Sequence, residues 1–261
     1  MRDEKYLIYD RSNKSYHLTR VENNLNKKDI LAIIKILLES RAFCQEELDK
    51  LIDSLYKLVG TEDKALIRGI IGNELLHYIP LEHGDLLLNK IWDFSQIVKK
   101  QEKLFIEYIR ADGKKVEREI KPVSLIFSEY YFYLMAYLDE EDFPVVYRID
   151  RIKRYMKLGE RFLIPYAKRF EAGEFRKRVQ FMYPGELMTI RFEFTHGVLE
   201  AVLDRLPTAK IIKEGEGKTT IEAEVFGEGV VVWLLSQGSK IRVLSPASLV
   251  EKMKEEVKRL G

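Results

Sequence analysis

The stretch Tyr130–Tyr155 restricts the possible folds more than any other part of the chain. Its first half alternates residue by residue, which predicts a strand with two different faces. One face would carry Tyr131, Tyr133, Met135 and Tyr137, and the other Phe132, Leu134, Ala136 and Leu138. Four acidic residues, Asp139–Asp142, repel one another and are best hydrated, so we expect a solvent-exposed hairpin connection there.

A second strand is predicted at Val145–Ile149, and basic residues gather at its end. These are Arg148, Arg151, Lys153 and Arg154. An aromatic strand next to an arginine-rich strand can hold a flat, negatively charged ligand, because rings stack on rings and guanidinium groups bind phosphates in a forked geometry.

These residues resemble those of the WYL-domain family. Phe132-Tyr133-Leu134 corresponds to the family's Trp-Tyr-Leu, with Phe132 in place of the tryptophan. Residues 147–152, YRIDRI, resemble the family's Phe-Arg-Leu-Asp-Arg-Ile, whereas Val145 stands where many members have a further arginine. Arg118 and Pro122 match an arginine and a proline that usually precede the aromatic strand.

The resemblance implies a ligand site on a small SH3/Sm-like barrel. The implied ligand-binding residues are Ser124, Tyr133, Arg148 and Arg151, with Arg118 and Tyr131 as possible additions. Arg148 and Arg151 have opposite parity on a straight strand, so they converge only if the strand ends or bulges near Asp150. The alternative is structural, since either arginine could instead pair with Asp150 or with the acidic hairpin.

The fold class expected for the whole chain is α+β. We expect a hairpin at 1–20, a helical linker and dimerisation region at 21–102, the barrel at 103–164, a basic linker at 165–185 and a ferredoxin-like domain at 186–261. In WYL regulators, a hairpin at the first position is the wing of a winged helix-turn-helix. The other helices of such a motif are not in this sequence, so promoter DNA is an expected partner only together with a helix-turn-helix.

The helical region shows apolar residues at helical spacing. Asn26 is the expected N-cap of a first helix, a second helix is predicted at Gln45–Val59 with Gly60 as its C-cap, and further helices are predicted at Thr61–Tyr78 and Gly84–Lys100. Packing or dimerisation is the expected role of this region.

Tight turns separate the predicted strands of the barrel. Ala111-Asp112-Gly113-Lys114 is a typical hairpin turn. Strands are predicted at 104–110, 117–127, 130–138 and 144–149, with a short one near 155–158, and short antiparallel strands of this kind indicate a small barrel. After residue 186 the predicted order is β-α-β-β-α-β followed by a helix, which is the ferredoxin-like order.

Composition argues against a membrane-spanning protein and against a disulfide-stabilised secreted protein. The net charge of +2 is small, but residues 145–180 hold eleven Lys or Arg against four acidic residues, a local net of +7. No apolar run approaches the roughly 20 residues that span a bilayer. A single cysteine, Cys44, cannot form an internal disulfide, which together with the charged N-terminus favours a cytoplasmic location.

Nothing in the sequence predicts catalysis, a metal or a cofactor. The four histidines, at 17, 77, 83 and 196, lack the compact spacing of metal ligands. Phosphate-binding and dinucleotide-binding glycine motifs are absent. We therefore expect no catalytic residues and no cofactor.

Two functions remain open. In the first, the chain is the effector-sensing and dimerising part of a WYL-type transcriptional regulator, whose barrel binds single-stranded nucleic acid or a nucleotide. In the second, it is a stand-alone module that binds single-stranded nucleic acid without specificity, or another protein. Steep salt dependence without length or sequence preference would favour the second function.

Overall fold

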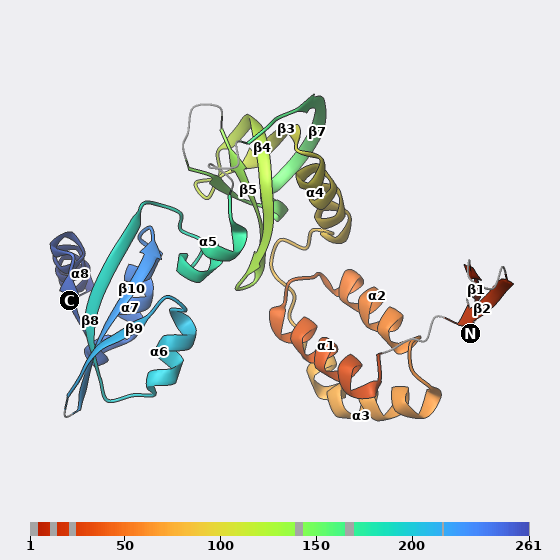
Figure 1. Cartoon of the computed structure of the whole chain (residues 1–261), viewed down its shortest axis with the longest axis horizontal. Helices are drawn as coiled ribbons and strands as arrows, with labels where there is room; N and C mark the ends of the chain where they lie inside the picture. Colours follow the sequence, from red (N-terminus) through yellow and green to blue (C-terminus); the bar gives the residue numbers. More distant parts are fainter. Residues whose placement is uncertain are drawn as a thin grey trace. The chain divides into compact units, whose positions relative to one another are not determined.

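The structure is a computed structural model, and it confirms the α+β class (Figure 1). It describes residues 5–10, 15–20, 25–138, 143–164, 170–215 and 217–260. The expected turn at Ser12-Asn13-Lys14 and the acidic connection Asp139–Asp142 lie outside these residues. The chain divides into two compact units, Met1–Asn89 and Lys90–Gly261.

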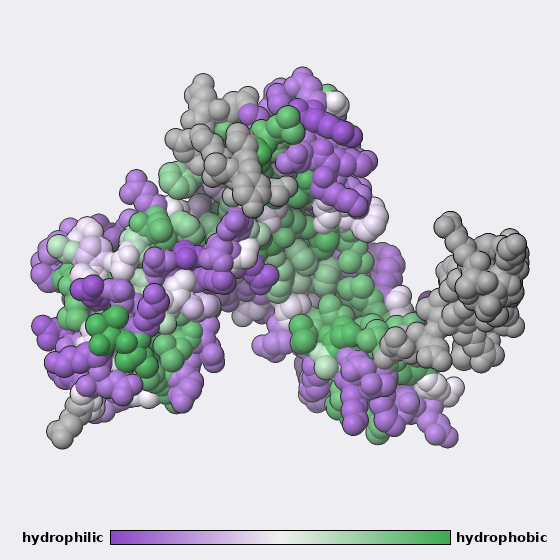
Figure 2. Space-filling view, in the orientation of Figure 1, coloured by the Kyte–Doolittle hydropathy of each residue, from purple (hydrophilic) through white to green (hydrophobic). Residues whose placement is uncertain are grey.

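The first unit contains a hairpin and helices. Strands β1 (Lys5–Asp10) and β2 (Ser15–Arg20) pair antiparallel, and the helices are α1 (Lys27–Ser40), α2 (Gln45–Tyr56) and α3 (Thr61–Leu76). The apolar stripes of these helices form the core, in which Ile30, Ile34, Leu48, Ile67 and Ile71 are almost fully buried. Figure 2 shows that further hydrophobic residues remain on the surface of this unit, next to hydrophilic ones.

The predicted cap of α1 is confirmed, whereas the predicted role of Gly60 is wrong. The Asn26 side chain accepts hydrogen bonds from the backbone N–H groups of Lys28 and Asp29, and Asp29 accepts one from the backbone of Asn26. Helix α2 already ends at Tyr56, and Gly60 precedes α3 as its N-cap with extended backbone angles. Glycine favours either helix end, so its presence alone could not distinguish them.

The second unit begins with α4 (Leu88–Lys100) and a five-stranded sheet. The strands are β3 (Glu102–Ile109), β4 (Lys115–Ser128), β5 (Tyr131–Tyr137), β6 (Val145–Arg148) and β7 (Ile152–Arg161), in the spatial order β6-β5-β4-β3-β7. The strand predicted near 155–158 is therefore considerably longer. Strand β4 pairs with β3 up to Ile120 and with β5 from Lys121 onward. A register shift between Pro122 and Ser124 lies just after this change of partner, and such bulges bend a strand.

Helix α4 packs on this sheet through Phe94, which is fully buried and meets the ring of Tyr155 edge-on at 4.9 Å. The Tyr155 hydroxyl donates to Asp93 at 2.6 Å. The Lys90 ammonium donates to the carbonyl groups of Ile149 and Ile152 at 3.3 and 3.0 Å. These bonds fix the turn that follows β6, where the predicted site lies.

The C-terminal domain has the ferredoxin-like order that the sequence predicts. Its elements are β8 (Leu187–Thr195), α6 (Leu199–Arg205), β9 (Lys210–Gly215), β10 (Lys218–Phe226), α7 (Gly229–Ser236), β11 (Ile241–Ser245) and α8 (Ala247–Leu260). The antiparallel sheet has the order β11-β8-β10-β9. Helices α6 and α7 contribute Val202, Val230 and Leu234 to a core that they share with Ile190, Phe192 and Ile221 of the strands.

The predicted basic linker contains a helix, α5 (Ala172–Arg178), and its continuation packs tightly on the C-terminal domain. Val179 forms a bridge with Phe226 at the end of β10. A side chain at Gly229 would have its Cβ 1.9 Å from the carbonyl oxygen of Gln180. Residue 229 therefore has to be glycine if the two backbones are to approach this closely.

Among the residues that the structure describes, no helix combines the length and the apolar character that crossing a membrane requires.

We predict that Gly229→Ala destabilises the protein by about 1–3 kcal/mol or more, because the new methyl group would overlap a backbone oxygen that cannot move independently. Gly173→Ala is the matched control, since a Cβ there meets nothing within 4 Å. Urea denaturation followed by circular dichroism measures both. Equal stability of the two variants would show that the 180–229 contact is not as close as described.

Candidate ligand-binding site

Strand pairing brings three of the predicted residues together. Tyr133 on β5 lies opposite Arg148 on β6, and Tyr131 lies on the same face of β5. The guanidinium carbon of Arg148 is 3.4 Å from the centre of the Tyr131 ring, which is a close cation–π contact. The rings of Tyr131 and Tyr133 meet edge-on, with their centres 6.3 Å apart.

Arg148 is also held by a carboxylate. Its Nε donates to Asp150 Oδ1 at 3.1 Å and its Nη2 donates to Asp150 Oδ2 at 2.7 Å, while Asp150 is only 4% exposed. The pairing that the sequence left open as the structural alternative is thus present. We call Tyr131, Tyr133, Arg148 and Asp150 the Arg148 cluster.

The pairing with Asp150 uses the Nε and Nη2 edge of the Arg148 guanidinium group and does not use Nη1. Among the described residues, Nη1 of Arg148 has no hydrogen-bond partner. An arginine that a buried carboxylate holds on one edge and a ring holds on one face keeps few conformations. It is therefore positioned to offer its remaining N–H groups to an anion at little further cost in entropy.

Tyr133 is an un-ionised phenol at neutral pH. Burial raises its pKa to about 12, although the positive charge of Arg148 acts in the opposite direction. The phenol can therefore donate a hydrogen bond to an acceptor beside Arg148. The site combines a ring, a phenolic donor and a guanidinium edge, which are suited to a ring system that carries phosphate.

The strand alternation ends before Arg151, so parity on a straight strand no longer determines the side on which Arg151 lies. The strand stops at Arg148, and residues Ile149–Arg151 form a 3-10 turn that reverses Asp150 onto Arg148. Arg151 is half-buried at the end of this turn and makes no hydrogen bond or ion pair with any described residue. No hydrogen bond, ion pair or cation–π contact among the described residues joins it to the Arg148 cluster.

The other two predicted residues differ in position. Ser124 lies opposite Met135, on the face of the β4–β5 ladder that carries Tyr133. Arg118 lies opposite Ile106 of β3, beyond the end of the β5 ladder, and its Nη1 donates to the carbonyl of Glu117. The fold therefore brings Ser124 toward the cluster but does not bring Arg118 there.

Helix α5 covers part of this face, which the sequence did not indicate. Buried residues of the sheet and of the α5 segment form what we call the α5 cluster: Ile126, Met135, Phe175, Val179 and Met182. Tyr133 and Val146 pack against it from the sheet. The phenylalanines of the basic segment thus serve packing, and one flank of the Arg148 cluster is apolar and closed.

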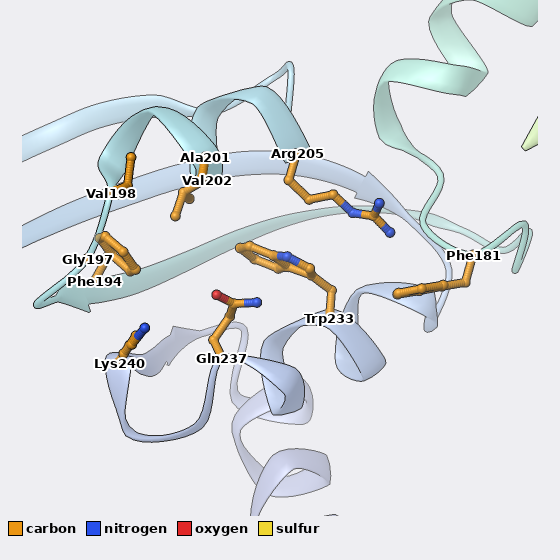
Figure 3. Close-up of a pocket in the computed structure, with 10 residues that line it drawn as sticks. All are labelled: Phe181, Phe194, Gly197, Val198, Ala201, Val202, Arg205, Trp233, Gln237 and Lys240. Atoms are coloured by element: carbon orange, nitrogen blue, oxygen red, sulfur yellow. The ribbon is translucent and has the colours of Figure 1, made fainter. Parts of the chain in front are cut away.

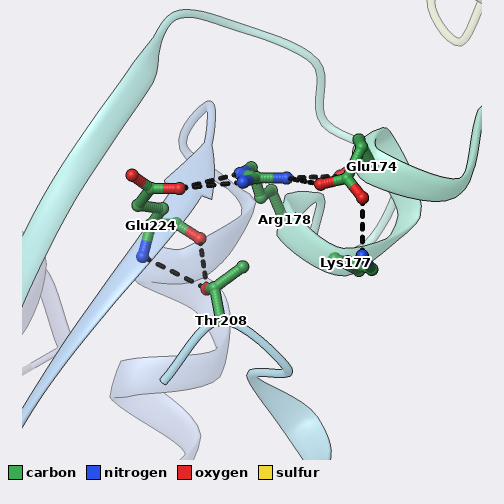
Figure 4. Close-up of polar contacts among 5 residues, drawn as sticks. All are labelled: Glu174, Lys177, Arg178, Thr208 and Glu224. Atoms are coloured by element: carbon green, nitrogen blue, oxygen red, sulfur yellow. Dashed lines mark hydrogen bonds and ion pairs between the residues drawn. The ribbon is translucent and has the colours of Figure 1, made fainter. Parts of the chain in front are cut away.

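Arg178 of α5 is paired with the C-terminal domain (Figure 4). Nη1 of Arg178 donates to Glu174 Oε2 at 2.6 Å, while its Nη2 donates to Glu224 Oε2 on β10 at 2.9 Å. Hydrogen bonds from Lys177 and Arg178 lower the pKa of Glu174. Two of the three basic residues of α5, Lys177 and Arg178, are therefore paired with carboxylates.

A contact that sequence reasoning missed links the β4–β5 turn to α6. Nη1 and Nη2 of Arg205 each donate to Glu129 Oε1 at 3.2 Å. Glu129 has a positive φ of 55°, which turns the chain between the two strands. The two residues of this pair are 76 positions apart in the chain. No local sequence pattern could therefore have indicated the contact.

Comparison with known proteins supports the assignment of both domains. Residues 93–156 match the WYL domain and residues 186–261 match the WCX domain, which together account for more than half of the chain. No curated protein sequence matches the chain significantly.

Two solved structures resemble the chain distantly. One is proteasome accessory factor B/C (PafBC) of Arthrobacter aurescens, with 15% identity and a TM-score of 0.34 over 93% of this chain and 36% of that one. The other is a CRISPR Cas-related protein, with 15% identity and a TM-score of 0.43 over 92% of this chain and 74% of that one. The chain thus spans about a third of the length of the PafBC chain, and neither likeness supports a functional conclusion.

Fold and site together define an α+β protein in which a small aromatic and arginine-bearing barrel is joined to a ferredoxin-like domain. The chain belongs to the WYL-domain family of regulators, and a WCX domain follows its barrel.

We predict that Tyr133→Phe removes a tyrosine that ionises near pH 12. Because the folded-state pKa is raised, the stabilisation by the buried phenol is complete below the ordinary tyrosine pKa of about 10 and is lost as the pH rises through about 12. The difference between the ultraviolet titration curves of wild type and variant measures the pH at which Tyr133 ionises. A difference that falls at about pH 10 instead would mean that the phenol is solvated.

Proposed function

We propose that this chain is the effector-sensing and dimerising part of a WYL-type transcriptional regulator that works in the cytoplasm. The effector is single-stranded nucleic acid or a nucleotide, bound at the barrel. The observation that carries this proposal is the Arg148 cluster, in which a guanidinium group is fixed by Asp150 and Tyr131 while its Nη1 has no partner among the described residues.

The chemistry of the cluster favours a nucleotide over a simple anion. A phosphate oxygen would accept from Arg148 and from the Tyr133 hydroxyl, and Arg151 would add a second positive charge. The exposed ring of Tyr130 meets Tyr131 edge-on, with the ring centres 6.5 Å apart, so a base has an aromatic surface beside the phosphate site. Ser124 would lie at the margin of this contact.

The helical unit supports the dimerisation part of the proposal. Several large apolar side chains on and after its helices are strongly exposed: Ile36, Leu66, Ile70, Leu76 and Ile79. Exposed apolar residues of this size are typical of a surface that another chain covers. Binding of the effector would then change the orientation of DNA-reading elements, and promoter DNA becomes a partner when a helix-turn-helix is present.

The alternative function, non-specific binding through the basic segment, has less support. Arg178 and Lys177 are paired with carboxylates, and Arg154 pairs with Glu107 at 3.3 Å. Counterion release would give this binding a steep salt dependence, so salt titrations separate it from binding at the Arg148 cluster.

We predict that Arg148→Ala/Arg151→Ala weakens binding of a fluorescein-labelled single-stranded DNA of about ten nucleotides by at least about tenfold, since each lost charge-assisted hydrogen bond costs about 1.5–3 kcal/mol. Fluorescence anisotropy at low salt measures the affinity. Arg148→Lys keeps the charge but loses the fork, and it should fall between wild type and the double variant.

The control is Lys254→Ala/Arg259→Ala, which removes the same charge from the exposed face of α8. Its affinity for the single strand should stay within about twofold of wild type, because neither residue belongs to the Arg148 cluster. Exposed ion pairs such as these also contribute little to the free energy of folding, so the variant should remain folded. The proposal fails if wild type does not bind at low salt. It also fails if the two double variants lose the same affinity, which would indicate a general electrostatic effect.

A further inference from the structure

The WCX domain contains a pocket that the proposed function does not use (Figure 3). It has a volume of about 520 Å³ and lies between α6 and α7, which is within the range of small-molecule sites. Its lining includes the residues used below, which are Phe181, Val202, Arg205, Trp233, Gln237 and Lys240.

The base of the pocket is apolar and fixed. The indole of Trp233 lies in its middle in Figure 3 and is only 6% exposed. Behind it the Trp233 and Phe192 rings meet edge-on at 5.9 Å, and Phe192 is fully buried. Val202 belongs to the same core. Such an apolar surface is suited to contact with a flat ring.

The polar groups at the pocket carry positive charge. Arg205 and Lys240 line it, and no Asp or Glu does. The ammonium group of Lys240 forms no ion pair among the described residues. Gln237 extends its amide into the pocket in Figure 3, and its Nε2 donates to Ser236 at 3.0 Å, which leaves its amide oxygen for a ligand donor.

Arg205 has an unused donor at this place. Its Nε is buried and has no hydrogen-bond partner, although its two other nitrogens contact Glu129. A buried N–H group without a partner costs free energy, so an acceptor in the pocket would remove that cost. The guanidinium group also lies over the Phe181 ring at 4.8 Å, which fixes its plane.

We propose that this pocket binds a small aromatic anion, with its ring against Trp233 and its anionic group at Nε of Arg205. Lys240 adds attraction at the other end of the pocket in Figure 3, so a second anionic group would increase affinity. The site shares no residue with the Arg148 cluster.

Glu129 competes with this ligand for Arg205. The ion pair holds the guanidinium group toward the β4–β5 turn, two residues before Tyr131. An anion in the pocket and the carboxylate of Glu129 therefore share one positive charge. Occupation of the pocket weakens the contact between the WCX domain and the barrel turn, and it couples the two domains.

The test uses the full chain labelled with nitrogen-15 at tryptophan and naphthalene-2-carboxylate as the probe. The chain has two tryptophans, Trp92 and Trp233, and Trp92→Phe assigns their indole signals. We expect a saturable shift of the Trp233 signal, and binding of neutral naphthalene-2-carboxamide about tenfold weaker because it loses the charge-assisted bond. The exposed Trp92 reports non-specific adsorption of the ring.

Variants separate the parts of the proposal. Arg205→Met and Lys240→Met should each weaken probe binding several-fold, while Glu129→Gln should strengthen it, because Arg205 loses its competitor. Glu214→Gln, at an exposed position on β9, is the control and should have no effect. Because the readout is the indole signal, failure here leaves the nucleic-acid result at the Arg148 cluster untouched.

Three outcomes would overturn the proposal. These are an unchanged Trp233 signal up to the solubility limit of the probe, equal affinity for the carboxylate and the carboxamide, and equal shifts of both indole signals. Unchanged affinity in Lys240→Met and Glu129→Gln together would also overturn it, even if Arg205→Met did not fold.

Discussion

The simultaneous contact of α5 with both domains of the second unit is the interaction on which the rest depends. Phe175 packs against Ile126 and Met135 of the barrel, and its ring stacks on Phe226 of the C-terminal sheet at 5.7 Å. Arg178 adds a polar connection by joining Glu174 to Glu224. Seven helical residues therefore pack beside the Arg148 cluster and connect this face of the sheet to the WCX domain.

Two arginines then perform related tasks near the turn of the β4–β5 hairpin. Arg148 is held by a buried carboxylate and a tyrosine ring, and Arg205 is held by Glu129 and a phenylalanine ring. In both, one part of the guanidinium group is satisfied within the protein and another part has no partner among the described residues. This division orients the group while keeping donors for an anion.

The sequence predicted features that depend on local patterns. Alternation defined β5, helical spacing and Asn26 defined α1, and the order of strands and helices defined the ferredoxin-like domain. Features that depend on contacts between residues far apart in the chain could not be predicted from local patterns. The charged composition of 165–185 concealed α5, whose seven residues bury little surface by themselves and are stabilised by tertiary contacts. The Arg205–Glu129 pair likewise exists only once both domains are folded, and the pocket only once α6 and α7 lie side by side in the C-terminal domain.

The most direct test of the barrel as the effector site is photo-crosslinking with a short single strand that contains 5-iodouracil, followed by mass mapping of the peptides. The account predicts crosslinks at Tyr130, Tyr131 or Tyr133, because Tyr131 lies against the guanidinium group that would hold the phosphate and the other two rings contact Tyr131. Crosslinks confined to the helical unit or to the WCX domain, with none on β5, would contradict it.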